Sequence, residues 1–394
     1  MSANQAMLDG IRVADMTGQI FGPYCTRMLA DLGAEVVKIE PPGGDIFRSL
    51  GRPAKTPGMG KLHMTINRGK KSVNWDLRQG EGRAKLKALI AASDVFIHNI
   101  RADGIARLGL DYDSVRVIAP DIIYVHCTGF DSAGPYAGAP AYDDIIQGAS
   151  GIAALASEVE GKAEPQYLPL ALADKVGGLY AVQAVLAAVI HKLRFGGGQF
   201  VEVPMFEAVT AFHLLENFAG AVFPDEPGKV GYRHVGSDRR PSPTADGYIC
   251  LAPYNDDRWQ RMFEVLGKPD LLQDERFCTT ALRMKNRSLL YTLIEEITPQ
   301  KTSREWLEAL RAVDVPAAPL NSLADLLTDP QLAASQFFRE RVHPTEGRYR
   351  DMRHPLKFSA LPEREPGFPP LIGEHSEELA AELGFAKAEA AHGN

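Results

Sequence analysis

Short runs of branched apolar residues alternate with segments of helical periodicity over the first half of the chain. Helical patterns run through Leu29 and Leu32 and over residues 81–92. The predicted strands are residues 10–15, 34–40, 94–97 and 121–126. Alternating strands and helices favour a mainly parallel sheet that helices cover. Ligands of such sheets gather at the carboxyl ends of the strands.

A long apolar helix is predicted from Asp174 to Phe195, and the glycines 196–198 end it. A strand at 199–203 follows, and from about residue 224 to 240 the composition shifts to Gly, Pro and charge, which indicates a boundary. Beyond it we predict a smaller α/β segment and then a tail, irregular after Pro330. Its elements are a strand at 247–251 and helices at 256–267, 281–298, 303–313 and 376–384.

Composition and charge narrow the classes of function. The 394 residues carry a net charge of −7, which argues against a broad nucleic-acid surface. The N-terminus lacks a signal pattern, and the apolar stretch 178–190 is too short to span a bilayer, so no membrane partner is expected. The scattered cysteines Cys25, Cys127, Cys250 and Cys278 suggest reduced thiols and a cytoplasmic protein.

Several common catalytic motifs are missing from the sequence. It contains no Gly-x-Gly-x-x-Gly fingerprint, no Walker loop, no Gly-x-Ser-x-Gly elbow and no His-x-x-x-His pair. These patterns hold dinucleotides, nucleotide phosphates, a catalytic serine and zinc, respectively. We therefore predict neither a nicotinamide oxidoreductase nor a serine hydrolase, and no metal ligands.

Asp174 is the most informative single residue. Apolar residues precede it, and Gly177 and Gly178 follow at the start of the long helix. A lone carboxylate in this setting is either a helix N-cap, for which Asp is a favoured residue, or a nucleophile. The residues alone leave both interpretations open, and caps are the commoner of the two.

Short motifs follow one another along nearly the whole chain. They lie at residues 8–13, 21–26, 32–40, 69–77, 94–99, 107–109, 203–208, 329–330, 354–359 and 373–375. Together and in this order they resemble the class III CoA-transferase family, also called the carnitine dehydratase/bile-acid-inducible family, of which formyl-CoA transferase is a member. The resemblance implies CoA or acyl-CoA as a substrate and small carboxylic acids as partners.

The resemblance also implies a fold. It is an α/β fold with a Rossmann-like large domain over residues 1–223 and a small α/β domain over 224–330. A C-terminal segment, 331–394, returns to the large domain. Two such chains interlock, so an interlocked homodimer is expected.

Asp174 falls where this family places its nucleophilic aspartate. The resemblance implies that its carboxylate attacks a thioester to give an aspartyl anhydride, and then an aspartyl-CoA thioester. We expect the helix N-terminus to keep the carboxylate ionised. We also expect Gly177 and Gly178 to leave room for the thioester and to offer backbone N–H groups to an oxyanion.

The resemblance implies a CoA site built from residues that follow successive strands. They are Gln19, Ile20, Phe21, Trp75, Arg78, Asn99, Ile100, Arg101, Arg107, Ala139, Tyr142 and Met205. Lys70 and Lys71 could join Arg78, Arg101 and Arg107 around the CoA phosphates, although any one of them could equally be a solvated surface cation.

Two departures from formyl-CoA transferase concern the substrate. Pro41 replaces an arginine, and the tetraglycine loop is absent, with residues 231–236 in its region. Arg233, His234, Arg239 or Arg240 could bind a second carboxylate there, or belong to a flexible charged loop. The donor could be succinyl-CoA or another small acyl-CoA, and the acceptor a short or dicarboxylic acid.

Two rival functions share the fold. An α-methylacyl-CoA racemase needs an acid–base group on each face of the α-carbon. Its histidine would fall at Tyr142, and the strand position of His126 favours a packing role, so the sequence favours a transferase. The other rival, a non-catalytic acyl-CoA-binding protein, is disfavoured by the presence of Asp174.

Overall fold

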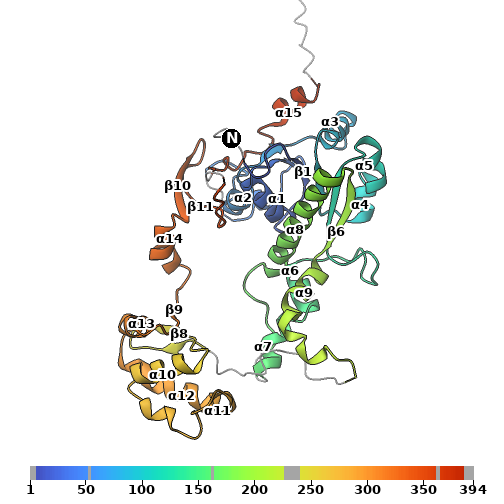
Figure 1. The fold of residues 1–394 in the computed structure, drawn as a ribbon. Helices are drawn as coiled ribbons and strands as arrows, with labels where there is room; N and C mark the ends of the chain where they lie inside the picture. The colour runs from blue at the N-terminus through green and yellow to red at the C-terminus, as the bar shows by residue number, and fades with distance from the viewer. Residues whose placement is uncertain (1–5, 52–54, 161–163, 226–239, 361–363, 386–394) are drawn as a thin grey trace, which may run out of the picture. The chain divides into compact units, whose positions relative to one another are not determined.

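The structure is a computed structural model that describes residues 6–51, 55–160, 164–225, 240–360 and 364–385 (Figure 1). Its contacts divide the chain into two compact units. Unit 1 comprises residues 1–154, 165–215 and 336–394, and unit 2 comprises 155–164 and 216–335. The domain boundaries inferred from the sequence stay a prediction.

A six-stranded sheet forms the centre of unit 1, and every neighbouring pair of strands is parallel. This confirms the parallel sheet predicted from the sequence. The order β3-β2-β1-β4-β5-β6 reverses direction between β1 and β4, where doubly wound sheets form a crevice. The strands are β1 (Arg12–Met16), β2 (Glu35–Ile39), β3 (Lys71–Val73), β4 (Val95–His98), β5 (Ile123–Thr128) and β6 (Gln199–Pro204).

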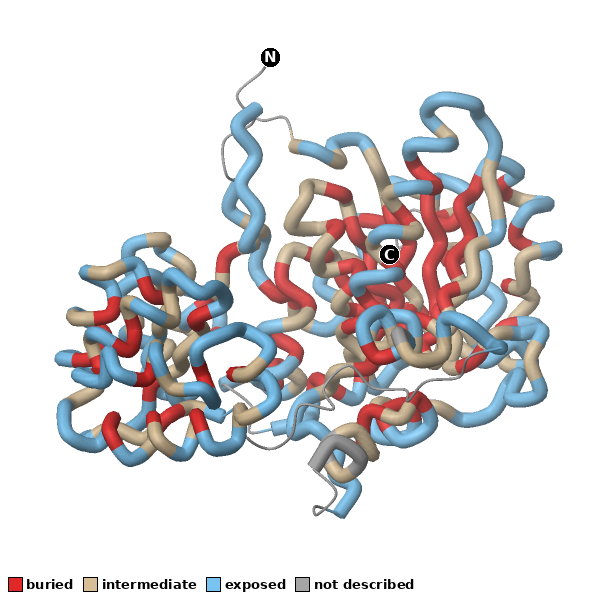
Figure 2. The backbone as a smooth tube through the Cα atoms, turned by 60° about the horizontal axis from the view of Figure 1, so that its bottom comes forward, coloured by how far each residue is buried: buried red, intermediate tan, exposed pale blue. Residues whose placement is uncertain are grey.

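Helices cover both faces of this sheet (Figure 1). Successive side chains of a strand point to opposite faces, so Val13 packs with α1 and α8 while Ala14 packs with α3 and α5. Figure 2 shows the resulting concentration of buried residues in the strands. The helices are α1 (Phe21–Asp31), α3 (Gly80–Ala91), α4 (Ala102–Arg107), α5 (Tyr112–Ile118) and α8 (Leu172–Phe195).

Helix α8 is long and apolar enough to cross a membrane by length and composition alone, contrary to the estimate from residues 178–190. The core helix of a globular unit passes the same test. Eight residues of α8, among them Val176, Val185 and Val189, are buried, and several of them pack against the sheet. We therefore interpret α8 as a core helix.

The remaining helices of unit 1 lie in the connections between these strands and helices or come after them in the chain. Helix α6 is Asp143–Ala149, and its Asp143 and Gln147 lie beside the start of α8. The others are η1 (Ile46–Arg48), α2 (Lys61–Ile66) and α15 (Ser376–Glu382). Helices α7 (Ile152–Glu160) and α9 (Met205–Asn217) each span the division between the two units.

The C-terminal tail contains an unpredicted hairpin. After α14 (Pro330–Ala334), β10 (Phe338–His343) pairs antiparallel with β11 (Gly347–Met352). The prediction of an irregular tail was wrong here because both strands carry many charged residues, which hides the alternation typical of strands. Arg68, which follows α2, donates to Asp351 at 2.7 Å, so buried charge rather than apolar area ties the hairpin to the rest of unit 1.

Unit 2 is a small α/β unit with an antiparallel sheet, in order β7-β8-β9. Its core includes Phe263, Phe277 and Trp306. The single helix predicted over 281–298 is two helices, because Asn286 leaves helical geometry and its amide donates to Leu282 O. The elements are η2 (Ala219–Ala221), β7 (Ser242–Pro243), β8 (Tyr248–Leu251), α10 (Asp256–Val265), η3 (Pro269–Leu272), α11 (Thr280–Lys285), α12 (Arg287–Ile297), η4 (Thr298–Gln300), α13 (Ser303–Ala312), β9 (Ala317–Pro319) and η5 (Asp325–Leu327).

Candidate active site

A cavity of about 770 Å³ opens at the carboxyl ends of β1, β4, β5 and β6 in unit 1. This is the edge at which a parallel sheet is expected to bind its ligand. Asp174 lines the cavity together with Gln19 after β1, Asn99 after β4 and Met205 after β6. The loop between β5 and α6, residues 129–142, supplies much of the remaining wall.

Asp174 is the third residue of α8 and does not cap it. The N-cap is Ala171, and no side chain caps the helix. The cap interpretation left open by the sequence is therefore wrong, because the helix begins two residues earlier than predicted. The Asp174 carboxylate has no hydrogen-bond partner among the described residues, and it faces a cavity large enough for a substrate.

Asp143 and Gln147 of α6 hold the start of α8 in place. The backbone N–H of Asp174 donates to Asp143 Oδ1 at 3.1 Å, and Gln147 Nε2 donates to Asp143 Oδ2 at 2.5 Å. Gln147 is fully buried and also accepts from the N–H of Leu168 at 2.8 Å. Because these bonds tie α6 to the segment before α8, the position of Asp174 depends on α6. Asp143 was not among the predicted site residues, although it follows Tyr142 directly.

The surroundings raise the pKa of Asp174 from 3.8 to about 7. Burial is the main cause, the nearby Asp143 carboxylate adds to it, and Lys175 opposes it. The expectation that the helix N-terminus keeps this carboxylate ionised is wrong near neutral pH, because desolvation and a like charge outweigh the helix dipole and leave the group only partly ionised there. A carboxylate with a raised pKa is a stronger nucleophile when it is ionised.

The turn between β1 and α1 is held by the side chain of Asn99. Its Oδ1 accepts from the N–H of Gly18 at 3.0 Å, and its Nδ2 donates to Gly18 O at 2.9 Å. The next residue, Gln19, has a left-handed φ of 65°, which is unfavourable for a residue with a side chain. The two bonds from Asn99 therefore support a strained turn at the mouth of the cavity.

The structure brings most of the predicted CoA-site residues to this cavity. They are Gln19, Phe21, Asn99, Ile100, Arg101, Ala139, Tyr142 and Met205. Among the described cations, Arg101 is the one that lines it, and no ion-pair partner of Arg101 is seen in the described part of the chain. Arg101 is therefore the available group for a phosphate at this position.

Four predicted CoA residues do not line the cavity. Trp75 is buried, and its indole N–H donates to Ser376 O at 3.3 Å. Arg78 is exposed and paired with Asp76, Arg107 is paired with Asp103 at 3.1 Å, and Ile20 precedes α1. Any contact of these four residues with CoA stays a prediction.

Lys70 and Lys71 do not project freely into solvent. Lys70 is buried, and its ammonium donates to Asp15 at 3.1 Å and to Thr26 at 2.7 Å. Lys71 bridges Glu35 and Glu378. The suggestion that Lys70 binds a CoA phosphate is wrong, because its buried ammonium group is already paired with Asp15.

Gly177 and Gly178 are needed for helix packing. A Cβ on Gly177 would lie 2.7 Å from the Phe21 ring, and one on Gly178 would lie 2.9 Å from the Tyr24 ring. Both lie beyond the first four residues of α8, whose N–H groups alone lack helical partners. The expected oxyanion role is therefore wrong, because the N–H groups of both glycines have acceptors within α8, and the expected room for a thioester stays a prediction. The glycines allow α1 to approach α8, which places Phe21 in the cavity wall.

Among the polar residues of the cavity wall, His126 was given a packing role in the sequence analysis and Glu202 was not considered. His126 stacks on His98 with ring centroids 4.6 Å apart, and its Nε2 lies 3.1 Å from Ile100 O. Burial lowers the pKa of His126, so its ring is neutral near pH 7. Strand alternation could have identified both residues, because each lies in a strand that ends at this edge. Within the described ranges, no group of His, Cys, Asp or Glu residues could hold a metal ion.

Comparisons with known proteins identify the family of this chain. The family model of CoA-transferase family III matches residues 8–376. The chain belongs to CoA-transferase family III. The succinate–glutarate CoA-transferase of Agrobacterium fabrum is 36% identical, with 95% of each chain covered. The human succinyl-CoA:glutarate CoA-transferase is 30% identical over 95% of this chain and 86% of its own.

Solved structures agree with this family assignment. A CAIB/BAIF family protein from Brucella suis is 34% identical and has a TM-score of 0.84, covering 96% of this chain and all of its own. The family III chain described here is thus a CoA-transferase, an enzyme that uses CoA thioesters. Most of the residues that were suggested to bind a second carboxylate lie outside the described residues, namely the region 231–236 with Arg233 and His234, and also Arg239. The remaining one, Arg240, pairs with Glu295 at 2.6 Å.

Proposed function

We propose that this family III enzyme moves CoA from an acyl-CoA to a small carboxylic acid with Asp174 as the nucleophile. The observation that carries the proposal is the Asp174 carboxylate, which faces the 770 Å³ cavity without a hydrogen-bond partner among the described residues. Its raised pKa and the support from Asp143 agree with a reactive group held in position.

The covalent steps are balanced without a cofactor. Asp174 attacks the thioester carbonyl carbon, the C–S bond breaks, and CoA leaves as a thiolate while the donor acyl group forms a mixed anhydride with Asp174. The thiolate then attacks the aspartyl carbonyl, which releases the donor acid and leaves an aspartyl-CoA thioester. The acceptor carboxylate attacks this thioester, which frees the thiolate and gives a second mixed anhydride. The thiolate then attacks the acceptor carbonyl of that anhydride, so the acceptor leaves as acyl-CoA and the Asp174 carboxylate is regenerated. Several moderate barriers replace one high barrier.

For substrates, we propose succinyl-CoA or a similar dicarboxyl-CoA as donor and a short dicarboxylate such as glutarate as acceptor. Two relatives that match nearly the whole chain carry succinate and glutarate in their names. Arg101 at the cavity wall is suited to a CoA phosphate, because guanidinium forms paired charge-assisted bonds with oxyanions.

An exchange assay tests the proposed reaction against the racemase alternative. Labelled glutarate incubated with unlabelled succinyl-CoA is expected to appear as labelled glutaryl-CoA by mass spectrometry. In deuterated water, a 2-methylacyl-CoA should keep its α-proton, since transfer touches only carbonyl carbons. Deuterium uptake without CoA exchange would identify a racemase, and tight CoA binding with neither reaction would identify a non-catalytic binding protein.

We also propose that the protein is a cytoplasmic, interlocked homodimer with a Rossmann-like large domain. Large apolar side chains are exposed on α8 and α9 of unit 1, which is unusual for a monomer. Leu193 on α8 is 74% exposed, Phe195 is 70% exposed, and Leu215 on α9 is 88% exposed.

Light scattering of the purified full chain is expected to give twice the 43.0 kDa mass of one chain. The double substitution Leu193→Asp and Phe195→Asp should lower this mass, because two charges would be buried at the interface. Leu323→Asp, at a residue that is 86% exposed in unit 2, serves as the matched control. A monomeric wild-type protein would contradict the dimer.

A further inference from the structure

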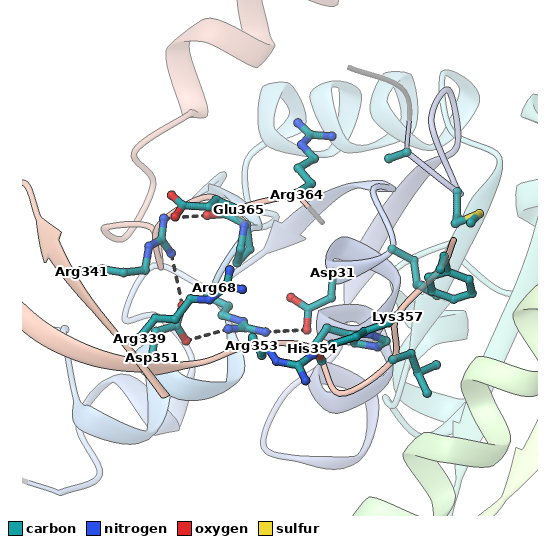
Figure 3. A pocket seen from close by; sticks show the side chains of 16 residues that line it. Asp31, Arg68, Arg339, Arg341, Asp351, Arg353, His354, Lys357, Arg364 and Glu365 are labelled. Atoms are coloured by element: carbon teal, nitrogen blue, oxygen red, sulfur yellow. Dashed lines mark hydrogen bonds and ion pairs between the residues drawn. The ribbon is translucent and has the colours of Figure 1, made fainter. Parts of the chain in front are cut away.

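A second cavity in unit 1, separate from the transfer cavity, is rich in cationic side chains. It measures about 320 Å³ and shares no lining residue with the cavity of Asp174. Its walls come from the end of α1, the end of α2, the hairpin β10–β11 and the segment after it (Figure 3). Six cationic side chains line it: Arg68, Arg339, Arg341, Arg353, Lys357 and Arg364.

The acidic residues of this cavity are fewer, and two of them are already used. Asp31 accepts from Arg68 at 2.8 Å, and Asp351 accepts from Arg68 at 2.7 Å and from Arg341 at 3.2 Å (Figure 3). Glu365 is the third acid in the wall. Lys357 and Arg364 are two cations of this wall for which no ion-pair partner is seen in the described part of the chain. Their positive charge favours a bound anion.

The arginines are fixed rather than mobile. Arg341 donates to Pro366 O at 2.8 Å, and its guanidinium lies 4.5 Å from the centroid of the Phe368 ring. Arg68 is buried, and its Nε has no partner among the described residues, so one strong donor remains unused inside the unit. A pre-ordered array of guanidinium groups binds carboxylate and phosphate oxygens with little loss of side-chain entropy.

Two of the six cations lie at the rim. Lys357 and Arg364 are exposed, and neither has an ion-pair partner in the described part of the chain. Apolar side chains, including Leu32, Leu356 and Phe358, complete the wall. The combination suits an anion that carries several charges on a short carbon skeleton, because the apolar wall can cover the skeleton while the cations bind the charged ends.

We propose that this cavity binds a small organic anion carrying two or more carboxylate or phosphate groups, independently of CoA transfer. A volume of about 320 Å³ is too small for a whole CoA molecule, which needs an extended groove. The ligand would bridge Arg68 in the first part of the chain with the C-terminal hairpin. Binding should therefore stabilise the attachment of the C-terminal segment to the rest of unit 1.

Titration calorimetry on the full-length protein without CoA tests this site. Citrate and glycerol 3-phosphate are the probes, and acetate is the monovalent control. Wild-type protein is expected to bind one or both probes, to bind acetate much more weakly, and to show a higher Tm at saturating probe. Citrate binding alone would identify a carboxylate site, and glycerol 3-phosphate binding alone a phosphate-ester site. No binding of either probe would overturn the proposal.

Matched variants locate the binding. The double substitution Lys357→Gln and Arg364→Gln is expected to weaken binding at least about tenfold, because two charge-assisted contacts are lost. The control Lys268→Gln and Lys285→Gln removes the same charge from exposed positions of unit 2 and should leave the affinity unchanged. If Arg101→Gln abolishes binding while the rim variant does not, the anion occupies the transfer cavity and the proposal fails. The CoA exchange activity of the rim variant is measured in the same experiment. It distinguishes a loss of anion binding at this cavity from a loss of CoA transfer at Asp174.

Discussion

Asp174→Ala is expected to abolish CoA exchange while the protein stays folded. Loss of the nucleophile removes the covalent route itself, and in enzymes of this kind such losses reach on the order of 10⁴-fold or more in kcat. The remaining cavity should still bind acyl-CoA, because the other lining residues are untouched. The expected pattern is therefore a lost kcat with a nearly unchanged affinity for acyl-CoA, measured by labelled-acid exchange and by calorimetry.

Chemical trapping supplies the direct check. Hydroxylamine added during turnover of the wild-type enzyme should convert an aspartyl anhydride or thioester into a hydroxamate, and peptide mass spectrometry should locate it at Asp174. Asp144→Ala is the matched control, because Asp144 is an exposed carboxylate on the neighbouring helix α6. Exchange that survives in Asp174→Ala, or a hydroxamate on another residue, would refute the assignment.

Stability separates a lost nucleophile from a lost fold. The pKa of Asp174 is raised from 3.8 to about 7, so its ionisation opposes folding. The neutral carboxyl group of Asp174 contributes most to the free energy of unfolding below pH 3.8. This contribution is lost as the pH rises through about 7, and the loss is at most about 4 kcal/mol. Asp174→Asn removes this cost. The variant should melt above the wild type at about pH 8, and the difference should shrink towards pH 4.

The periodic parts of the chain were predictable from the sequence. Buried strands such as 94–97 and 121–126 are continuous apolar runs, and β4 and β5 lie where they were expected. Family motifs added the position of Asp174 and most of the loop residues that line its cavity. Local pattern carries this information because each strand must bury both faces between helices.

The remaining features depend on neighbours that are distant in sequence. Gly177 faces Phe21, about 150 positions away, so nothing beside it indicates that it serves packing. Lys70 looks like a surface cation until the sheet places Asp15 at 3.1 Å from its ammonium. The pKa of Asp174 likewise depends on Asp143, which only the fold brings to the start of α8. The local sequence pattern therefore could not predict packing contacts and electrostatic interactions between segments that are distant in sequence.

The rate of exchange is expected to fall about tenfold for each pH unit below about 7, because only ionised Asp174 can attack a thioester. Asp143→Asn should move this acid limb to lower pH. The substitution removes the negative charge that helps to raise the pKa of Asp174, while its amide oxygen can still accept the N–H of Asp174. Because burial is the larger cause, the pKa of Asp174 should stay above 3.8 in the variant.

The measurement is kcat/KM for exchange between about pH 5 and 9 in the wild type, Asp143→Asn and Asp144→Asn. Asp144→Asn removes the same charge from the exposed neighbour and should leave the acid limb in place, which separates the local effect of Asp143 from a change in net charge. A profile that is flat down to pH 5, or one that moves equally in both variants, would show that Asp174 is not the titrating nucleophile. A shift of the acid limb that is confined to Asp143→Asn would instead show that the reactivity of Asp174 depends on its contact with α6. The Asp143 carboxylate both accepts the backbone N–H of Asp174 at 3.1 Å and helps to raise the pKa of the Asp174 side chain.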